Sequence, residues 1–144
     1  MGATRWRTNW AAVAEPGTVR VEVPRAPRAR RAELVRLGGV AAGTPVALLA
    51  SGPGAIGRCR RFAARAGVAV DRAYLAFPSA TAPAYLVEDA ACTVRVFTKT
   101  MLVAPLSARF ATPMMLAVAV LRWLSPWRLL RALAPGRVVV GRRA

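Results

Sequence analysis

The chain has 144 residues, with 22 Lys+Arg, six Asp+Glu and no histidine, so its formal net charge is +16. This length is typical of one domain, and 56% hydrophobic residues exclude a disordered basic tail. Two cysteines are too few for a disulfide scaffold. Without histidine there is no imidazole for a metal site or a catalytic triad, and we predict no metal site.

The N-terminal third alternates between irregular and regular patterns. Residues 1–17 show no clear period and are expected to form a short helix or an arm. Thr18–Val23 alternates apolar and charged residues, which predicts a half-buried strand. The basic, proline-broken segment Pro24–Arg31 (residues 24–31) is predicted to be an exposed loop. Arg31–Leu37 then predicts a short helix that ends at Gly38-Gly39.

The stretch from residue 44 to 77 predicts a β-turn-α-β unit. Pro45–Ala50 is a continuous apolar run, as expected of a strand covered on both faces. A glycine-rich turn follows it, and then a helix to Ala66 that ends at Gly67. Val68–Phe77 is again strand-like. We expect these two strands to be parallel and joined by a right-handed crossover.

The C-terminal half is predicted to be mainly helical. Pro83–Val87 suggests a short strand, and Thr93–Val103 fits both a helix and a strand, with a helix slightly favoured and Asp89 as its cap. Helices are predicted at 112–124 and 125–134, and Arg137–Gly141 predicts a final strand. The expected fold is a single α/β domain over residues 1–144, with a small, mostly parallel sheet, a Rossmann-like β-α-β unit and a helical C-terminal third.

A glycine motif lies at the turn of the β-α-β unit. Residues 52–57 read Gly-Pro-Gly-Ala-Ile-Gly, which fits G-x-G-x-x-G after a predicted strand and at a helix start. Such a loop allows a tight turn and places backbone N–H groups where an anionic ligand can bind. Asp71 lies 19 residues after Gly52, and this fingerprint expects an acidic residue about 20 residues on to accept a ribose hydroxyl. The alternatives are a purely structural turn and a different anionic ligand.

On these residues, Pro45–Phe77 resembles the first β-α-β unit of Rossmann-like proteins, including class I S-adenosylmethionine-dependent methyltransferases. The resemblance implies S-adenosylmethionine as cofactor. Gly52, Gly54 and Gly57 would then contact its methionine part, and Asp71 its ribose. That family commonly has an acidic residue before the glycine loop, and this strand has none.

Three residues are candidates for catalysis. Glu88 and Asp89 are the only adjacent carboxylates and lie at the end of a predicted strand, although helix capping is the favoured explanation for them. Cys59 lies between two arginines near a helix start, where positive charge lowers a thiol pKa. Its position on the apolar side of the helix instead favours a buried core residue.

The arginines divide into groups by position. Arg58, Arg61 and Arg65 share the face of the predicted helix opposite its apolar side, which predicts either an anion-binding face or a solvated one. No helix-turn-helix, RNP-type aromatic pattern or zinc knuckle accompanies the arginines, so nucleic-acid binding would rest on charge alone and would not be sequence-specific.

Residues 113–134 are apolar on several sides, so the sequence predicts that a partner chain or a membrane surface covers part of them. The expected docking residues are Met114, Met115, Leu121, Trp123, Trp127 and Leu130. No signal peptide or membrane span is recognised, and the expected location is cytoplasmic, with peripheral membrane contact as an option.

Three functions are compatible with the sequence. The first is a non-autonomous accessory subunit that docks onto a larger enzyme and holds an anionic or peptide ligand through its arginines. The bias toward Ala and Arg suggests a GC-rich genome and, with it, a peptide-modifying or secondary-metabolite complex. The second is a small methyltransferase-like enzyme that binds S-adenosylmethionine. The third is a charge-driven binder of nucleic acid or of a membrane surface.

Overall fold

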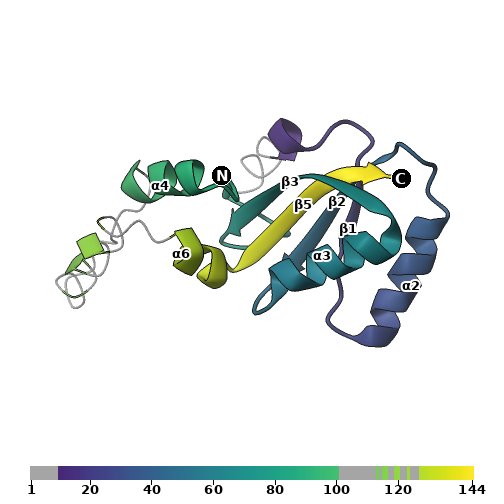
Figure 1. Ribbon diagram of the computed structural model, residues 1–144, viewed down its shortest axis with the longest axis horizontal. Coiled ribbons are helices and arrows are strands. Elements are labelled where there is room, and N and C mark those ends of the chain that lie inside the picture. The colour runs from purple at the N-terminus through teal and green to yellow at the C-terminus, as the bar shows by residue number, and fades with distance from the viewer. Residues whose placement is uncertain (1–9, 101–112, 114, 117–118, 121–122, 124–126) are drawn as a thin grey trace.

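The computed structural model describes residues 10–100, 113, 115–116, 119–120, 123 and 127–144. Its helices pack around one five-stranded sheet (Figure 1). In chain order they are β1 (Val19–Glu22), α2 (Pro27–Gly38), β2 (Pro45–Ser51), α3 (Ala55–Ala66), β3 (Val68–Phe77), β4 (Tyr85–Glu88), α4 (Ala91–Thr100), α6 (Trp127–Leu133) and β5 (Gly136–Arg143). The α/β class and most of the predicted elements are confirmed.

The strand order β1-β2-β5-β3-β4 corrects the predicted topology. Only β1 and β2 pair in parallel, whereas β5 is antiparallel to both of its neighbours and β4 is antiparallel to β3. The expectation of a mostly parallel sheet is therefore wrong. β2 and β3 run in the same direction, but the last strand of the chain lies between them and receives the ladder hydrogen bonds that a Rossmann-like pair would exchange directly.

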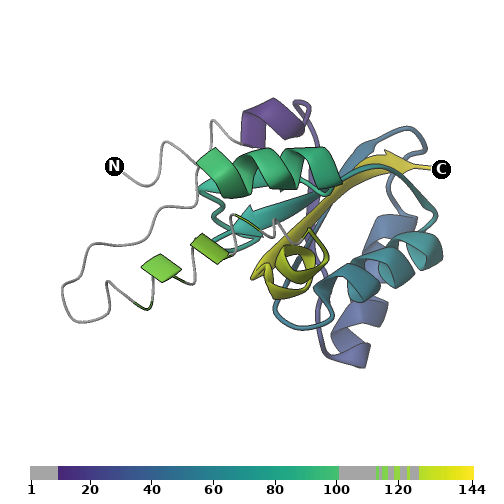
Figure 2. The ribbon, with the colours of Figure 1, turned by 60° about the vertical axis from the view of Figure 1, so that its left-hand side comes forward.

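The two faces of the sheet carry different layers (Figures 1 and 2). Val46, Leu48 and Ala50 of β2 face the core beneath α2 and α3. The alternate residues Ala47 and Leu49 face the opposite side, where Trp10 is buried at 1% exposure. Residues 10–13 are helical, as in one of the two predicted alternatives, and residues 10–14 pack on the sheet. Residues 1–9 lie outside the described part.

α2 begins four residues earlier than the sequence suggested. Pro27 occupies its first turn, and the helix runs through the segment that was expected to be a loop. Proline is well suited to this position because the first N–H groups of a helix have no intrahelical acceptor. Pro27, which the sequence pattern suggests would interrupt a helix, instead lies at the start of one.

α4 and α6 cover the sheet beside β3 and β4. Thr93–Thr100 is helical, as the slightly favoured prediction had it, and Val94 and Thr98 are buried. Trp127 and Leu130 of α6 are half-buried against Leu75, Val87 and Val94. These two residues are therefore covered, at least in part, by the chain's own core.

The described residues of the preceding apolar segment are helical and exposed. Met115, Leu116, Val120 and Trp123 have exposed fractions of 55%, 67%, 45% and 84%. Met114 and Leu121 lie outside the described residues. Within the described parts of the chain, no helix combines the length and apolarity that a membrane crossing needs.

Candidate anion-binding groove

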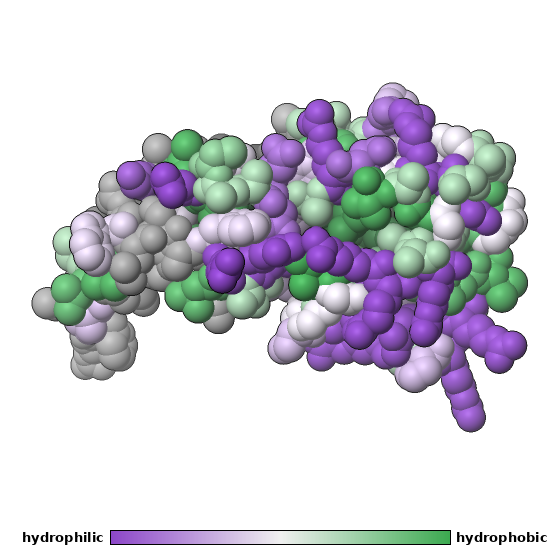
Figure 3. Space-filling model, in the orientation of Figure 1, coloured by the Kyte–Doolittle hydropathy of each residue, from purple (hydrophilic) through white to green (hydrophobic). Residues whose placement is uncertain are grey.

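A groove of about 260 Å³ lies between α2 and α3. Its lining consists of four arginines and two apolar side chains: Arg30, Arg58, Arg61, Arg65, Leu34 and Phe62. Hydrophilic side chains gather over these two helices in Figure 3. We call this feature the arginine groove.

Helical spacing places these side chains on facing surfaces. Arg58, Arg61 and Arg65 recur three and four residues apart along α3, as predicted. Arg30 and Leu34 are likewise four residues apart on α2. Phe62 is buried and belongs to the core beneath the helices, so it forms an apolar wall between the arginines.

Two of the four guanidinium groups are held in place by backbone oxygens. Arg58 donates from Nη1 to the carbonyl of Pro53 and from Nη2 to that of Ser51. Arg30 donates from Nη2 to the carbonyl of Arg25, at 3.0 Å. The Nε atoms of Arg30 and Arg58 are buried and have no hydrogen-bond acceptor among the described residues. Both arginines are therefore ordered and keep unused donor capacity.

No acidic side chain in the described chain compensates this charge. The ion pairs found there join Glu33 to Arg36, Glu15 to Arg142, and Asp89 to Arg131 and Arg137. None of them involves a groove arginine. Four clustered guanidinium groups without a carboxylate favour an anion, because each presents N–H groups that match carboxylate or phosphate oxygens in pairs.

The glycine loop lies directly beside the groove and is a tight, internally bonded turn. Gly52 and Gly54 have φ values of 75° and 69°, a region in which side chains with a Cβ are strained. The N–H of Gly52 donates to the carbonyl of Pro135 at 2.9 Å. Arg25 and Arg58 both donate to the Ser51 carbonyl at the end of β2. The turn thus connects β2 to α3 along the chain, and hydrogen bonds hold it to Pro135, just after α6, and to two arginine side chains.

Asp71 lies at the other end of the sheet from this loop. Ser51 pairs with Gly136, which in turn pairs with Ala76, whereas Asp71 lies in the β-bulge after Val70. At about 3.3 Å per residue, this separates Asp71 from the loop by roughly 15 Å along the strand. Its exposed side chain instead borders a separate hollow of about 440 Å³. The structure therefore does not bring Asp71 together with Gly52, Gly54 and Gly57.

Burial keeps the Cys59 thiol in its neutral form. The side chain is fully buried, and desolvation raises the pKa of its thiol to about 11, although Arg58 and Arg137 act in the opposite direction. The thiol is therefore protonated at neutral pH and is not an activated nucleophile. Its position on the apolar side of α3 outweighs the neighbouring charges.

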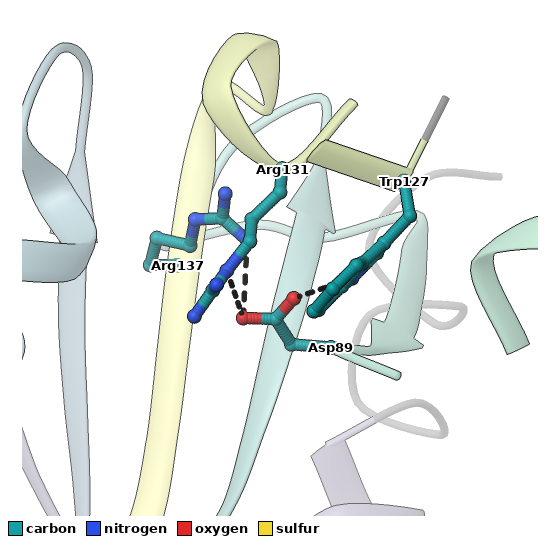
Figure 4. Close-up of polar contacts among 4 residues, drawn as sticks. All are labelled: Asp89, Trp127, Arg131 and Arg137. Atoms are coloured by element: carbon teal, nitrogen blue, oxygen red, sulfur yellow. Dashed lines mark hydrogen bonds and ion pairs between the residues drawn. The ribbon is translucent and has the colours of Figure 1, made fainter. Parts of the chain in front are cut away.

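Glu88 and Asp89 do not form a carboxylate pair. Glu88 is exposed and lies opposite Tyr74 in the ladder. The Asp89 side chain is only 5% exposed and accepts hydrogen bonds from Trp127 Nε1 at 3.1 Å and Arg131 Nε at 2.9 Å (Figure 4). It fastens α6 to the end of β4.

Sequence reasoning missed three parts of these sites. Arg30 and Leu34 were assigned to an exposed loop and a separate short helix, and the spacing of a helix starting at Pro27 is the signal that would have placed them in the groove. Arg137 lies in an apolar strand next to a proline-glycine turn, and no sequence pattern indicates that it reaches Asp89.

Within the described residues, no three Cys, Asp or Glu side chains gather as a metal site would require. Comparison of the chain with protein-family models, with curated proteins and with solved structures gives no match.

Proposed function

We propose that this protein is an accessory subunit that binds an anionic ligand in the arginine groove and presents it to a partner enzyme. The observation that carries the proposal is the set of four guanidinium groups around one groove, with no acidic side chain among the described residues to balance them.

The chemistry of the groove favours a compact, multiply charged anion. Guanidinium groups bind phosphate and carboxylate oxygens through paired N–H donors. A volume of about 260 Å³ lies below the roughly 300–1,000 Å³ of pockets that enclose drug-sized ligands. Phosphate chains, or the phosphate or carboxylate part of a larger molecule, match this size and charge.

An accessory role agrees with the state of the candidate catalytic groups. The Cys59 thiol is protonated, and Asp89 is engaged by two arginines and a tryptophan. Both side chains are buried, so neither is placed to contact a substrate. These side chains support a binding function rather than chemistry by the chain alone.

The exposed apolar residues between 115 and 123 support the presence of a partner. Met115, Leu116, Val120 and Trp123 are exposed, and several large apolar side chains left exposed on a protein surface are typical of interaction surfaces. We propose that this part of the predicted docking region contacts the partner protein. Trp127 and Leu130 contribute instead to the fold.

Isothermal titration calorimetry with inorganic triphosphate tests the groove. We expect one triphosphate to bind in the groove of each chain, with an affinity that falls at least about tenfold for each of Arg61→Gln and Arg65→Gln, since a charged hydrogen bond contributes about 1.5–3 kcal/mol. The matched control is Arg60→Gln, an exposed arginine on the same helix that does not line the groove.

Equal loss of affinity in all three variants would contradict the groove and indicate binding by net charge alone. S-adenosylmethionine serves as the second ligand in the same experiment. Because Asp71 and the glycine loop lie at opposite ends of the sheet, we expect no saturable heat from it. Binding that Gly54→Val abolishes would favour the methyltransferase-like alternative instead.

A further inference from the structure

A second group of charged side chains lies outside the groove, where β4 ends and β5 begins. Trp127 and Arg131 of α6, Arg137 of β5 and Asp89 of the loop after β4 converge there, and we call them the Asp89 cluster (Figure 4). Trp127 Nε1 donates to one carboxylate oxygen of Asp89, and Arg131 Nε donates to the other. Arg137 Nη1 is 3.9 Å from that second oxygen, an ion pair too long for a hydrogen bond.

The cluster carries an uncompensated positive charge. It contains two guanidinium groups and one carboxylate, and Arg137 is only 4% exposed. Burial lowers the pKa of Arg137, Asp89 opposes this effect, and Arg131 adds to it. An arginine nevertheless stays charged at neutral pH. A buried net charge is costly unless a further group of opposite sign balances it.

Arg137 also has hydrogen-bond donors left over. Neither of its terminal nitrogens, Nη1 and Nη2, has a hydrogen-bond acceptor among the described residues, although both are buried. Such groups in folded proteins are almost always paired with protein, water or an ion. The net positive charge and the unsatisfied N–H donors both indicate an anion with hydrogen-bond acceptors.

We propose that the Asp89 cluster binds one small oxoanion, a carboxylate or a phosphate, against the terminal nitrogens of Arg137. Arg131 is 27% exposed, so the cluster is open to solvent at this side chain. The bound anion neutralises the second guanidinium and accepts the hydrogen bonds that no protein atom accepts. This site shares no residue with the arginine groove, so anion binding here is independent of the proposed function.

The indole N–H of Trp127 is a direct reporter, because it donates to Asp89 inside the cluster. Its NMR signal is assigned by its loss in Trp127→Phe. During titration with inorganic phosphate at constant ionic strength, we expect a saturable shift of this signal in the parent protein. Sodium acetate in place of phosphate distinguishes a carboxylate site from a phosphate site.

Two variants remove the uncompensated charge without leaving a lone buried ion. Arg131→Gln leaves Asp89 paired with Arg137, and Arg137→Met leaves it paired with Arg131. In both we expect the anion-dependent shift to disappear. Arg128→Gln, an exposed arginine on the same helix, should retain it, as should the groove variant Arg61→Gln.

The proposal is overturned if neither anion shifts the Trp127 signal of the parent protein, which would mean that water satisfies Arg137. It is also overturned if Arg131→Gln keeps the saturable shift. Arg131→Gln decides the matter even if Arg137→Met fails to fold, because Arg131 is partly exposed. Loss of phosphate binding here with triphosphate binding intact in the groove would separate the two sites.

Discussion

The position of Cys59 on α3 shows how burial overrides local charge at the scale of one residue. Arg58 and Arg60 flank it in the sequence, and that pattern alone favours a reactive thiolate. In the fold its side chain turns into the core, so desolvation exceeds the attraction of the neighbouring charges. Sequence spacing predicted both possibilities, and only the packing of α3 on the sheet decides between them.

This burial predicts a pH dependence of stability. The thiol pKa is about 11 in the folded protein against 9.0 for the unperturbed group, so the unfolded chain loses its proton first. The free energy of unfolding should therefore fall between about pH 9 and 11, by roughly 3 kcal/mol from this group, at 1.36 kcal/mol per pKa unit. Below pH 9 the contribution is fully present.

Urea denaturation at pH 8, 9, 10 and 11 measures this dependence. Cys59→Ala should show a smaller alkaline decrease than the parent protein, whereas Cys92→Ala, at the exposed cysteine, should show the same decrease. An identical decrease in Cys59→Ala and the parent would show that other groups cause it.

At the scale of elements, local patterns predicted the strands and helices better than their arrangement. The spacing of α3, its end at Gly67 and both flanking strands are confirmed. The place of β5 between β2 and β3 follows from contacts between the chain's end and its middle, which no local period encodes. The same limit explains why the two halves of the expected cofactor site are separated.

The central position of β5 leads to a second prediction. A Cβ at Gly141 would lie 2.0 Å from the carbonyl oxygen of Ala69 and 3.0 Å from the Cα of Val70. Because these are backbone atoms of the neighbouring strand, they cannot move aside without disturbing the ladder. Gly141→Ala should lower the free energy of unfolding by at least about 2 kcal/mol, as overpacking does.

Gly38→Ala is the matched control, since a Cβ there meets no atom within 4 Å at the end of α2. It should leave stability unchanged or raise it slightly, by up to about 1 kcal/mol. Thermal and urea unfolding of both variants provide the comparison. Equal stability of Gly141→Ala and Gly38→Ala would contradict the close approach of β5 to β3.

At the scale of the whole molecule, arginines that contribute to the net charge of +16 gather at two places, the arginine groove and the Asp89 cluster. Arg58, Arg61 and Arg65 were predicted as an anion-binding face and do line the groove. The α2 side of the groove was not predicted, because Pro27 was interpreted as part of a loop. A site built between two helices depends on how they pack, which the sequence of either helix does not contain.

The exposed apolar residues between 115 and 123 predict association of the isolated protein. With Leu116 and Trp123 at 67% and 84% exposure, we expect the purified chain to self-associate as its concentration rises. Analytical ultracentrifugation should show a shift toward the monomer in the double variant Leu116→Ser, Trp123→Ser. Val35→Ser, at an exposed valine of α2, should leave the association unchanged. A strictly monomeric parent protein at all concentrations would contradict the interaction surface.

Anion binding in the arginine groove is tested most directly by titrating the arginine side-chain Nε–H NMR signals with inorganic triphosphate. We expect the signals of Arg30, Arg58, Arg61 and Arg65 to shift together and to saturate at one equivalent, while those of Arg28 and Arg60 do not move. Gradual, unsaturated shifts of all arginine signals, which disappear as salt is added, would contradict this expectation and leave only bulk charge.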